Sequence, residues 1–230
     1  MRIGIVAALD DEARTLDVTS GSAGEIPSYD VRVSGPGITN AANCAQNFVD
    51  AGVKGLIAWG TAGALNTDLA PGAVIVYNAV ISHANQRLEC DPQWVAHLMH
   101  SLRSFEPTLA LGFTAHSALT NQLEKSTVAQ RFGATVVDME SSAIAEQAQR
   151  AGLPFVAIRA IVDPANFNLP SCALQALAHG GQPRIIPVLK GLARRPQELP
   201  ALLQLSRWYR KSLDTLRLTA HVLHPTFGLD

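Results

Sequence analysis

Two carboxylates stand directly after apolar, strand-like runs and are the residues best placed for chemistry. Glu140 follows the run Ala134 to Val137 and precedes an alanine-rich helical stretch. Asp163 closes the apolar run Phe155 to Val162, and Pro164 keeps that strand from continuing. Ligands of open α/β sheets bind at the carboxyl ends of the strands. The sequence therefore predicts that both acids serve a functional cleft.

A third acidic group, Asp10-Asp11-Glu12, follows the first apolar strand and opens a predicted helix. Acids in a first helical turn cap free N–H groups and complement the helix dipole, which is one sufficient explanation. Three in succession are more than capping needs. The alternative is that one of them reaches the same cleft, where it acts as a base toward water or holds a sugar hydroxyl.

Small residues follow another strand. The block Gly60-Thr61-Ala62-Gly63-Ala64 comes directly after the run Leu56 to Trp59 and is predicted to form a turn. Such a turn can aim N–H groups, and the hydroxyl of Thr61, at an anion or a ribose hydroxyl. A plain strand-to-loop connection is the alternative. The block lacks the G-x-G-x-x-G spacing of dinucleotide-binding turns.

Strand-like and helical patterns alternate along the first 165 residues, which favours an α/β fold with a mixed or mainly parallel sheet and helices on both faces. Asp91-Pro92 has the order of an N-cap and first helical position. The predicted strands are Ile3 to Ala8, Val31 to Ser34, Leu56 to Trp59, Ala73 to Ile81, Leu109 to Thr114, Ala134 to Val137 and Phe155 to Val162.

The chain of 230 residues, 47% of them hydrophobic and 16% charged, is expected to be one domain covering residues 1–230. Beyond Asp163 the pattern is helical, over Ser171 to His179, Ile185 to Ala193 and Pro196 to Ala220. Residues 180–220 carry eight basic and two acidic side chains. This predicts a basic, amphipathic C-terminal appendage at about 171–220, which meets anionic lipid or another subunit. The alternative is a terminal helix packed on the core with a solvated face.

The remaining composition favours an intracellular setting. The N-terminus enters a strand without a basic leader, and no apolar run is long enough to cross a bilayer, so a cytoplasmic location is expected, peripheral to the inner membrane if the tail binds lipid. Three scattered cysteines predict neither a disulfide framework nor a zinc site. We expect no metal and no nucleic-acid partner.

Four blocks, in this order and spacing, resemble the nucleoside phosphorylase and nucleosidase superfamily. The resemblance covers most of residues 1–165 and is closest to the methylthioadenosine/S-adenosylhomocysteine nucleosidases. Narrower features of the tail, at residues 166–170 and 194–196 and in the terminal helix, are similar to the hopanoid-associated phosphorylases. The four blocks run from Gly4 to Glu12, Gly60 to Leu65, Val137 to Glu140 and Arg159 to Asp163.

The resemblance implies a three-layer α/β/α sandwich around a twisted mixed sheet, assembled as a homo-oligomer. It also implies roles for individual residues. Asp163 matches the catalytic acid at N7 of the purine, and Glu12 the acid that orients the attacking water. Substrate contacts are implied for Glu140 at the ribose hydroxyls, Met139 against the sugar, Thr61 near the nucleophile, and Leu119 where nucleosidases place a base-stacking aromatic. Gly63, in the same block as Thr61, is also implied to bind substrate.

These roles suit the chemistry of breaking a C1′–N9 bond, because a purine anion leaves readily only if it takes a proton. A free aspartic acid, with pKa ~3.9, is almost fully ionised at neutral pH, so burial or the purine must raise the pKa of Asp163. Alternatively Asp163 stays ionised and accepts a hydrogen bond from the exocyclic amine of adenine.

The nucleophile stays open. Ala58 stands where tightly phosphate-binding relatives carry an arginine, and the acids at 10–12 stand where they use basic residues, which favours water. Arg14 or a neighbouring subunit can still supply positive charge, so phosphate remains a candidate co-substrate. No other cofactor is expected.

The sequence thus predicts an enzyme that releases adenine from a nucleoside. Adenosylhopane, of hopanoid biosynthesis, is the leading substrate hypothesis. One alternative is a salvage enzyme, a nucleosidase for methylthioadenosine or S-adenosylhomocysteine or another purine nucleoside phosphorylase. The other is a catalytically silent nucleoside- or lipid-binding protein.

Overall fold

The computed structural model describes residues 2–17, 28–171, 173 and 195–228. Strands and helices alternate in them as the sequence predicts. The elements are β1 (Ile3–Ala7), α1 (Asp10–Ala13), η1 (Arg14–Leu16), β2 (Tyr29–Val33), α2 (Ile38–Asp50), β3 (Leu56–Ala64), β4 (Val74–Ile81), β5 (Arg87–Glu89), α3 (Pro92–Ser101), η2 (Arg103–Phe105), β6 (Thr108–Thr114), α4 (Gln122–Phe132), β7 (Val136–Asp138), α5 (Ser141–Arg150), β8 (Phe155–Ile161), η3 (Pro196–Glu198) and α8 (Leu199–Leu223).

The described strands form one mixed sheet in the order β2-β1-β3-β7-β6-β4-β5, and β8 pairs with both β3 and β4. β3 runs parallel to β1 and β8, whereas β4 runs antiparallel to β8 and parallel to β6. β7 joins β6 to the last two residues of β3. These pairings close a ring of five strands, β3-β8-β4-β6-β7, with β1 and β2 extending one side. The predicted α/β fold with a mixed sheet is confirmed.

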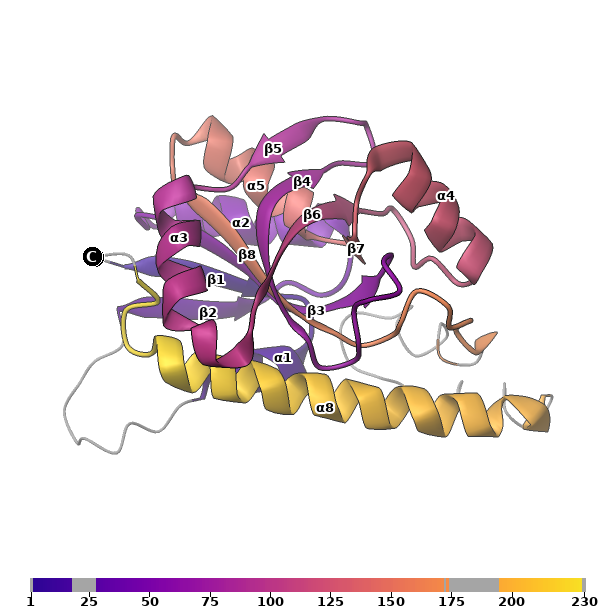
Figure 1. The fold of residues 1–230 in the computed structure, drawn as a ribbon. Helices are drawn as coiled ribbons and strands as arrows, with labels where there is room; N and C mark the ends of the chain where they lie inside the picture. The colour runs from indigo at the N-terminus through magenta and orange to yellow at the C-terminus, as the bar shows by residue number, and fades with distance from the viewer. Residues whose placement is uncertain (1, 18–27, 172, 174–194, 229–230) are drawn as a thin grey trace.

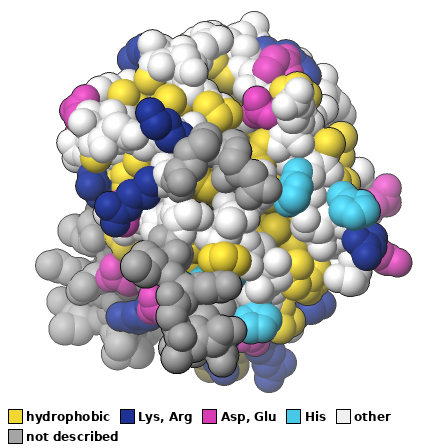
Figure 2. All heavy atoms as spheres, turned by 90° about the vertical axis from the view of Figure 1, so that its left-hand side faces the viewer, with side chains coloured by type: hydrophobic (Ala, Val, Ile, Leu, Met, Phe, Trp, Pro, Cys, Tyr) yellow, Lys and Arg dark blue, Asp and Glu magenta, His cyan; other side chains and the backbone are white. Residues whose placement is uncertain are grey.

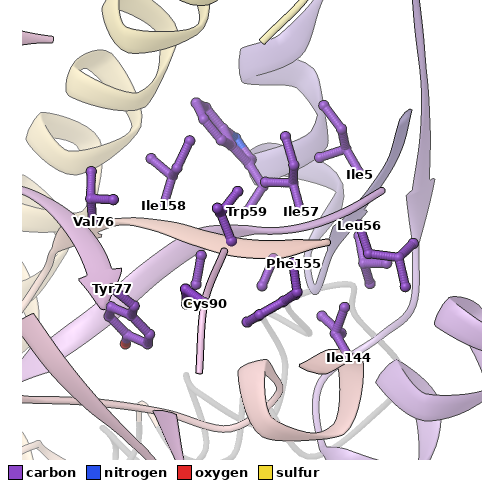
Figure 3. Packing of buried hydrophobic residues seen from close by; sticks show 14 of the residues in the cluster. Ile5, Leu56, Ile57, Trp59, Val76, Tyr77, Cys90, Ile144, Phe155 and Ile158 are labelled. Carbon is purple, nitrogen blue, oxygen red and sulfur yellow. The ribbon is translucent and has the colours of Figure 1, made fainter. Parts of the chain in front are cut away.

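Helices cover the sheet on both faces. Figure 1 shows α8 running along one face and α2 and α5 lying behind the other. Successive side chains of a strand point to opposite faces. Figure 3 shows the result in the core, where Trp59 and Ile158 point to one side of the strands and Phe155 and Tyr77 to the other. All four are at most 3% exposed. Both faces of the central strands are therefore sealed, as their nearly continuous apolar sequence requires.

The helix α8 joins the core through its C-terminal half, where Leu216, Ala220 and Leu223 are buried. The hydroxyl of Ser212 donates to the carbonyl oxygen of Ile161 in β8 at 2.5 Å. This agrees with the alternative that the sequence left open, a terminal helix packed on the core. The other helices predicted between residues 171 and 193 fall almost wholly outside the described residues.

The prediction of a turn at the Gly60 block is wrong. β3 continues from Leu56 to Ala64, because β8 pairs with it as far as Ala62 and β7 pairs with Gly63 and Ala64. A run of small residues allows the strand to curve where the ring closes. The block is therefore part of the sheet, and pairing with β8 holds the backbone of Thr61 in place.

The described surface carries mixed charge. On the face that Figure 2 shows, basic, acidic and histidine side chains are interspersed among apolar and polar groups. None of the described helices is both long and apolar enough to span a membrane.

Candidate active site

A cavity of about 750 Å³ opens at the carboxyl ends of β1, β7 and β8. The predicted acids Glu12, Glu140 and Asp163 all line it, although 151 positions separate the first from the last. The predicted residues Thr61, Gly63, Leu119 and Met139 line it as well. The prediction that three distant carboxylates share one cavity is confirmed.

Glu12 is only 2% exposed and its carboxylate is held by four donors. Its Oε1 accepts from the backbone N–H and the hydroxyl of Thr61, both at 2.8 Å. Its Oε2 accepts from the N–H groups of Ala8 at 3.2 Å and Leu9 at 3.1 Å. Burial raises the pKa of Glu12, while the charge of Arg159 and the Thr61 donors oppose that rise. The side chain of Glu12 is therefore held in one position, and it binds a proton more readily than an exposed glutamate does.

Gly60 lies against the same carboxylate. A Cβ at this position would lie 2.7 Å from the carboxyl carbon of Glu12, well inside van der Waals contact. The glycine also has φ of +151°, which side-chain-bearing residues rarely adopt. Glycine at position 60 is therefore required for Glu12 to pack on β3.

Glu140 occupies the N-cap position of α5, directly after β7. Its Oε1 accepts from the N–H of Gly37 at 2.9 Å, across 103 residues of sequence, and its Oε2 from the N–H of Met139 at 3.3 Å. Burial raises the pKa of Glu140 to about 7, although Arg159 and the Gly37 N–H favour its ionised form. Gly37 is the N-cap of α2, and the sequence analysis did not connect it with Glu140.

Beneath Glu140 lies an ion pair that the sequence analysis did not identify. Arg159, 1% exposed on β8, approaches Asp138 at 3.3 Å and donates to the hydroxyl of Ser141 at 2.8 Å. Asp138 also accepts from the N–H groups of Glu140 and Ser141 at 3.2 and 3.1 Å. These two bonds fix the backbone at the start of α5, from which Glu140 projects. The Nε of Arg159 has no hydrogen-bond partner among the described residues.

Asp163 follows β8 and is 8% exposed. Its Oδ2 accepts from the ammonium of Lys125, a residue of α4 that is 1% exposed. Burial raises the pKa of Asp163 above its ordinary value, while the ammonium of Lys125 opposes that rise. Nothing in the sequence marks Lys125, because a lysine between Glu124 and Ser126 resembles any solvent-facing helical residue. This partner is the main addition that the structure makes to the predicted site.

Two further predicted residues, Gly63 and Leu119, line the cavity near Asp163. A Cβ at Gly63 would lie 3.2 Å from Oδ1 of Asp163, so a larger residue there would press on the carboxyl group. Leu119 lines the cavity together with Ser117 and Ala118. This wall carries no aromatic ring from that segment, as the sequence predicts, and offers apolar packing to a ligand.

The helix α8 supplies a second wall that sequence analysis did not assign to the site. Leu202, Leu205, Ser206 and Tyr209 line the cavity, and Leu169 adds to them. A cavity of this volume is within the range of about 300–1,000 Å³ typical of small-molecule sites. It combines buried carboxylates with an extended apolar surface, so it suits a ligand with a polar, hydroxyl-bearing part and an apolar part.

The three carboxylates can accept hydrogen bonds from hydroxyl groups, take a proton from water, or donate a proton when protonated. Within the described segments, no group of three or more His, Cys, Asp or Glu side chains is arranged to hold a metal ion. The acidic character of the cavity suits neutral, hydroxyl-rich ligands better than anions.

Comparison with protein families gives one match, in which the profile described as "Phosphorylase superfamily" covers residues 12–172. The matched range contains Glu12, Glu140 and Asp163. A comparison with curated protein sequences gives no match.

Solved structures with the same fold are numerous, and three illustrate the likeness. The Helicobacter pylori 5′-methylthioadenosine/S-adenosylhomocysteine nucleosidase is 16% identical with a TM-score of 0.72, over 95% of each chain. The futalosine hydrolase of the same organism is 16% identical with a TM-score of 0.73, over 97% of each chain. The Streptococcus pyogenes S-adenosylhomocysteine nucleosidase is 22% identical with a TM-score of 0.67, over 96% of each chain. At these identities the likeness establishes the three-layer fold.

Proposed function

The chain belongs to the phosphorylase superfamily, a superfamily of glycosidic-bond-cleaving enzymes, and from that premise we propose that it hydrolyses the N-glycosidic bond of an adenine nucleoside and releases adenine. The observation that carries this proposal is the convergence of Glu12, Glu140 and Asp163 in one cavity. Similarity to solved nucleosidases, one of them crystallised with adenine, supports the choice of base.

Each carboxylate suits one part of the reaction. In this proposal Glu140 accepts hydrogen bonds from the ribose hydroxyls, with Met139 packed against the sugar. Asp163 donates a proton to N7 as the C1′–N9 bond breaks, which turns the purine into a neutral leaving group. Glu12 accepts a proton from the water that attacks C1′. Negative charge beside the sugar also stabilises the electron-poor ribose of the transition state.

Water is the nucleophile that the geometry favours over phosphate. The Thr61 N–H and hydroxyl and the Leu9 N–H, which are the kinds of donors that hold anions, are already bound to the carboxylate of Glu12. A phosphate next to that carboxylate would meet like charge in a buried site, where repulsion is strong. Arg14 lines the cavity, but its guanidinium pairs with Asp11 at 2.9 Å.

The apolar wall supports a substrate with a bulky apolar group at the 5′ position. Leu202, Leu205 and Tyr209 of α8 would pack on such a group. Adenosylhopane is the substrate of this kind that we propose, because its sterol-like skeleton needs a large apolar surface. Methylthioadenosine and S-adenosylhomocysteine are the second candidates, and the small 5′ group of the former would leave most of this wall uncovered.

The outer face of the same helix supports contact with a membrane surface. Leu199 and Leu203 are 42% and 50% exposed, and Arg207 and Arg210 lie exposed on the same half of α8. Apolar side chains next to arginines on an amphipathic helix favour binding to anionic lipid. We expect flotation with vesicles containing anionic lipid, weaker flotation with zwitterionic vesicles, and loss of flotation in Leu203→Ser. Equal flotation of the variant would refute this contact.

One assay separates the substrate and nucleophile hypotheses. Purified protein is incubated with adenosylhopane, methylthioadenosine or S-adenosylhomocysteine, each with and without phosphate, and free adenine is quantified. We expect the highest kcat/KM for adenosylhopane and no effect of phosphate. Adenine release that requires phosphate would make the enzyme a phosphorylase, and tight binding without release would make it a binding protein. Homo-oligomer formation stays a prediction, checked by light scattering of the same samples.

A further inference from the structure

Lys125 is one of the most deeply buried charged side chains among the described residues, at 1% exposure on a helix whose neighbouring Leu123 is 75% exposed. Its ammonium has three hydrogens, and three acceptors surround it. They are Oδ2 of Asp163, the carbonyl oxygen of Pro164 at 2.8 Å and the carbonyl oxygen of Phe167 at 3.2 Å. A neutral amine has only two hydrogens to donate, so this environment fits the charged form.

Burial of a lysine is costly unless its charge is compensated. The two carbonyl contacts tie α4 to the segment after β8, and a neutral donor would serve that purpose equally well. The carboxylate of Asp163 is the acceptor that requires the positive charge, and it belongs to the cavity in which we place the chemistry. The location of Lys125 therefore points to a role in controlling the protonation of Asp163.

We propose that Lys125 is a positioning residue that turns Asp163 into a directed acid, holding Oδ2 so that the transferable proton sits on Oδ1 and stabilising the carboxylate that remains after the transfer. An ammonium only donates hydrogen bonds, so the oxygen that it occupies is the unfavourable site for a proton. The inference rests on the proposed function, since it assumes that Asp163 protonates the departing base.

In the proposed step every proton that leaves one group is taken up by another. The C1′–N9 bond breaks and its electron pair moves into the purine. The Oδ1–H bond of Asp163 breaks and an N7–H bond forms, leaving a carboxylate paired with Lys125. Water forms the new bond to C1′ and its proton goes to Glu12. After release of adenine and the free sugar, Glu12 returns a proton to solvent and Asp163 takes one up.

Several titratable and charged side chains share the cavity with Asp163 and can influence how this step depends on pH. Titratable and charged side chains reach the cavity from every element around it: Asp10, Asp11 and Glu12 of α1, Arg14 of η1, Lys125 of α4, Asp138 at the end of β7, Glu140 before α5 and Tyr209 of α8. Of these, Lys125 is the one in hydrogen-bond contact with Asp163. Because its ammonium favours the carboxylate, removing it is expected to raise the pKa of Asp163.

The experiment compares Lys125→Met, which keeps length but removes charge, with Lys125→Arg, which keeps charge. Lys54→Met, at an exposed position, is the matched control. Adenine release from methylthioadenosine is measured across the pH range. In Lys125→Met we expect kcat to fall about tenfold or more, as befits weakened general acid catalysis, with KM changed less than about twofold. The alkaline limb of its kcat profile should shift to higher pH, whereas Lys125→Arg should keep the wild-type limb.

The proposal is overturned if the alkaline limb of the kcat profile of Lys125→Met stays at the wild-type pH. It is also overturned if kcat falls and KM rises to the same extent, because Lys125 would then be only a structural contact. A shift of the limb to lower pH would overturn it as well. Thermal unfolding of the variants establishes that the protein compared is folded. If Lys125→Met does not fold, the double variant Lys125→Met/Asp163→Asn should fold, because both buried charges are removed together. Failure of the double variant as well would contradict charge pairing as the reason for this lysine.

A second measurement separates this inference from the proposed function. Carboxyl ¹³C NMR of protein labelled at aspartate, with Asp163→Asn to assign the signal, gives the pKa of Asp163 without any turnover. A higher pKa in Lys125→Met together with no adenine release by the wild type would refute the proposed function but not the pairing. An unchanged pKa would refute the pairing even in an active enzyme.

Discussion

Replacement of Glu140 by glutamine should change how the stability of the protein depends on pH. The pKa of Glu140 is raised from 4.5 to about 7 by burial, so the folded protein holds a proton on this group that the unfolded chain has released. Between these two values the folded state binds more protons, and the free energy of unfolding must fall as pH rises. A difference of about 2.5 units corresponds to about 3.4 kcal/mol, at about 1.36 kcal/mol per unit. Below pH 4.5 and above the folded-state value the contribution of this group is flat.

Glu140→Gln keeps the shape of the side chain and an oxygen for the Gly37 N–H, but it cannot ionise. Urea unfolding at pH 5 and at pH 8 gives the fall in the free energy of unfolding between these two pH values. That fall should be smaller in the variant than in the wild type by up to about 3 kcal/mol. At pH 8 the variant should be the more stable protein. Gln46→Glu, at an exposed position of α2, is a control for altered net charge. Equal pH dependence of wild type and Glu140→Gln would refute the view that burial outweighs Arg159 and the Gly37 N–H in setting the pKa of Glu140.

Four other substitutions test separate parts of the site. Glu12→Gln should lower kcat for adenine release about a hundredfold or more, with no recovery on addition of phosphate. Gly60→Ala should displace the Glu12 carboxylate and lower kcat to a similar extent, and a fully active alanine variant would contradict the packing described. Leu205→Asp should lower kcat/KM for soluble substrates with apolar 5′ groups more than for adenosine, whereas Leu203→Asp on the exposed face of the same helix should change neither. Asp138→Asn should lower the free energy of unfolding by about 3–5 kcal/mol, measured in urea, because Arg159 loses its partner.

Sequence reasoning located the carboxylates because their signal is local. Glu140 and Asp163 stand at sharp transitions between a run of buried residues and a polar segment, and a strand end is visible in the sequence itself. Glu12 follows the first strand in the same way. β1 and β8 both run parallel to β3, so the residues that follow them meet at one edge of the sheet. Glu140 reaches the same cavity by another route, because β7 pairs antiparallel with the last two residues of β3.

The partners of these acids were not predictable, because they come from distant segments and from residues with no distinctive context. Lys125 lies 38 positions from Asp163, and only the packing of α4 against the segment after β8 makes it buried. The contact of Gly37 with Glu140 spans 103 positions. Arg159 lay within a recognised motif, yet its role as the counter-charge of Asp138 depends on the pairing of β8 within the sheet.

The strand β3 shows a different limit. Small residues such as Gly60 and Gly63 usually mark a turn, and local propensity favoured that interpretation. Here tertiary contacts prevail, because β8 and β7 supply partners for the backbone of β3 beyond Trp59. The same contacts place the Thr61 N–H against Glu12, so the error concerned the element and not its position in the site.

Under the proposed function, Glu12, Glu140 and Asp163 act together to cleave an adenine nucleoside with water. The most direct test is to incubate the enzyme with methylthioadenosine and adenosylhopane in ¹⁸O-water without phosphate, and to follow both products by mass spectrometry. We expect free adenine together with a sugar product that carries one ¹⁸O at C1′, and neither product in Asp163→Asn. Absence of adenine release from both nucleosides, or undiminished release by Asp163→Asn, would contradict the proposed function.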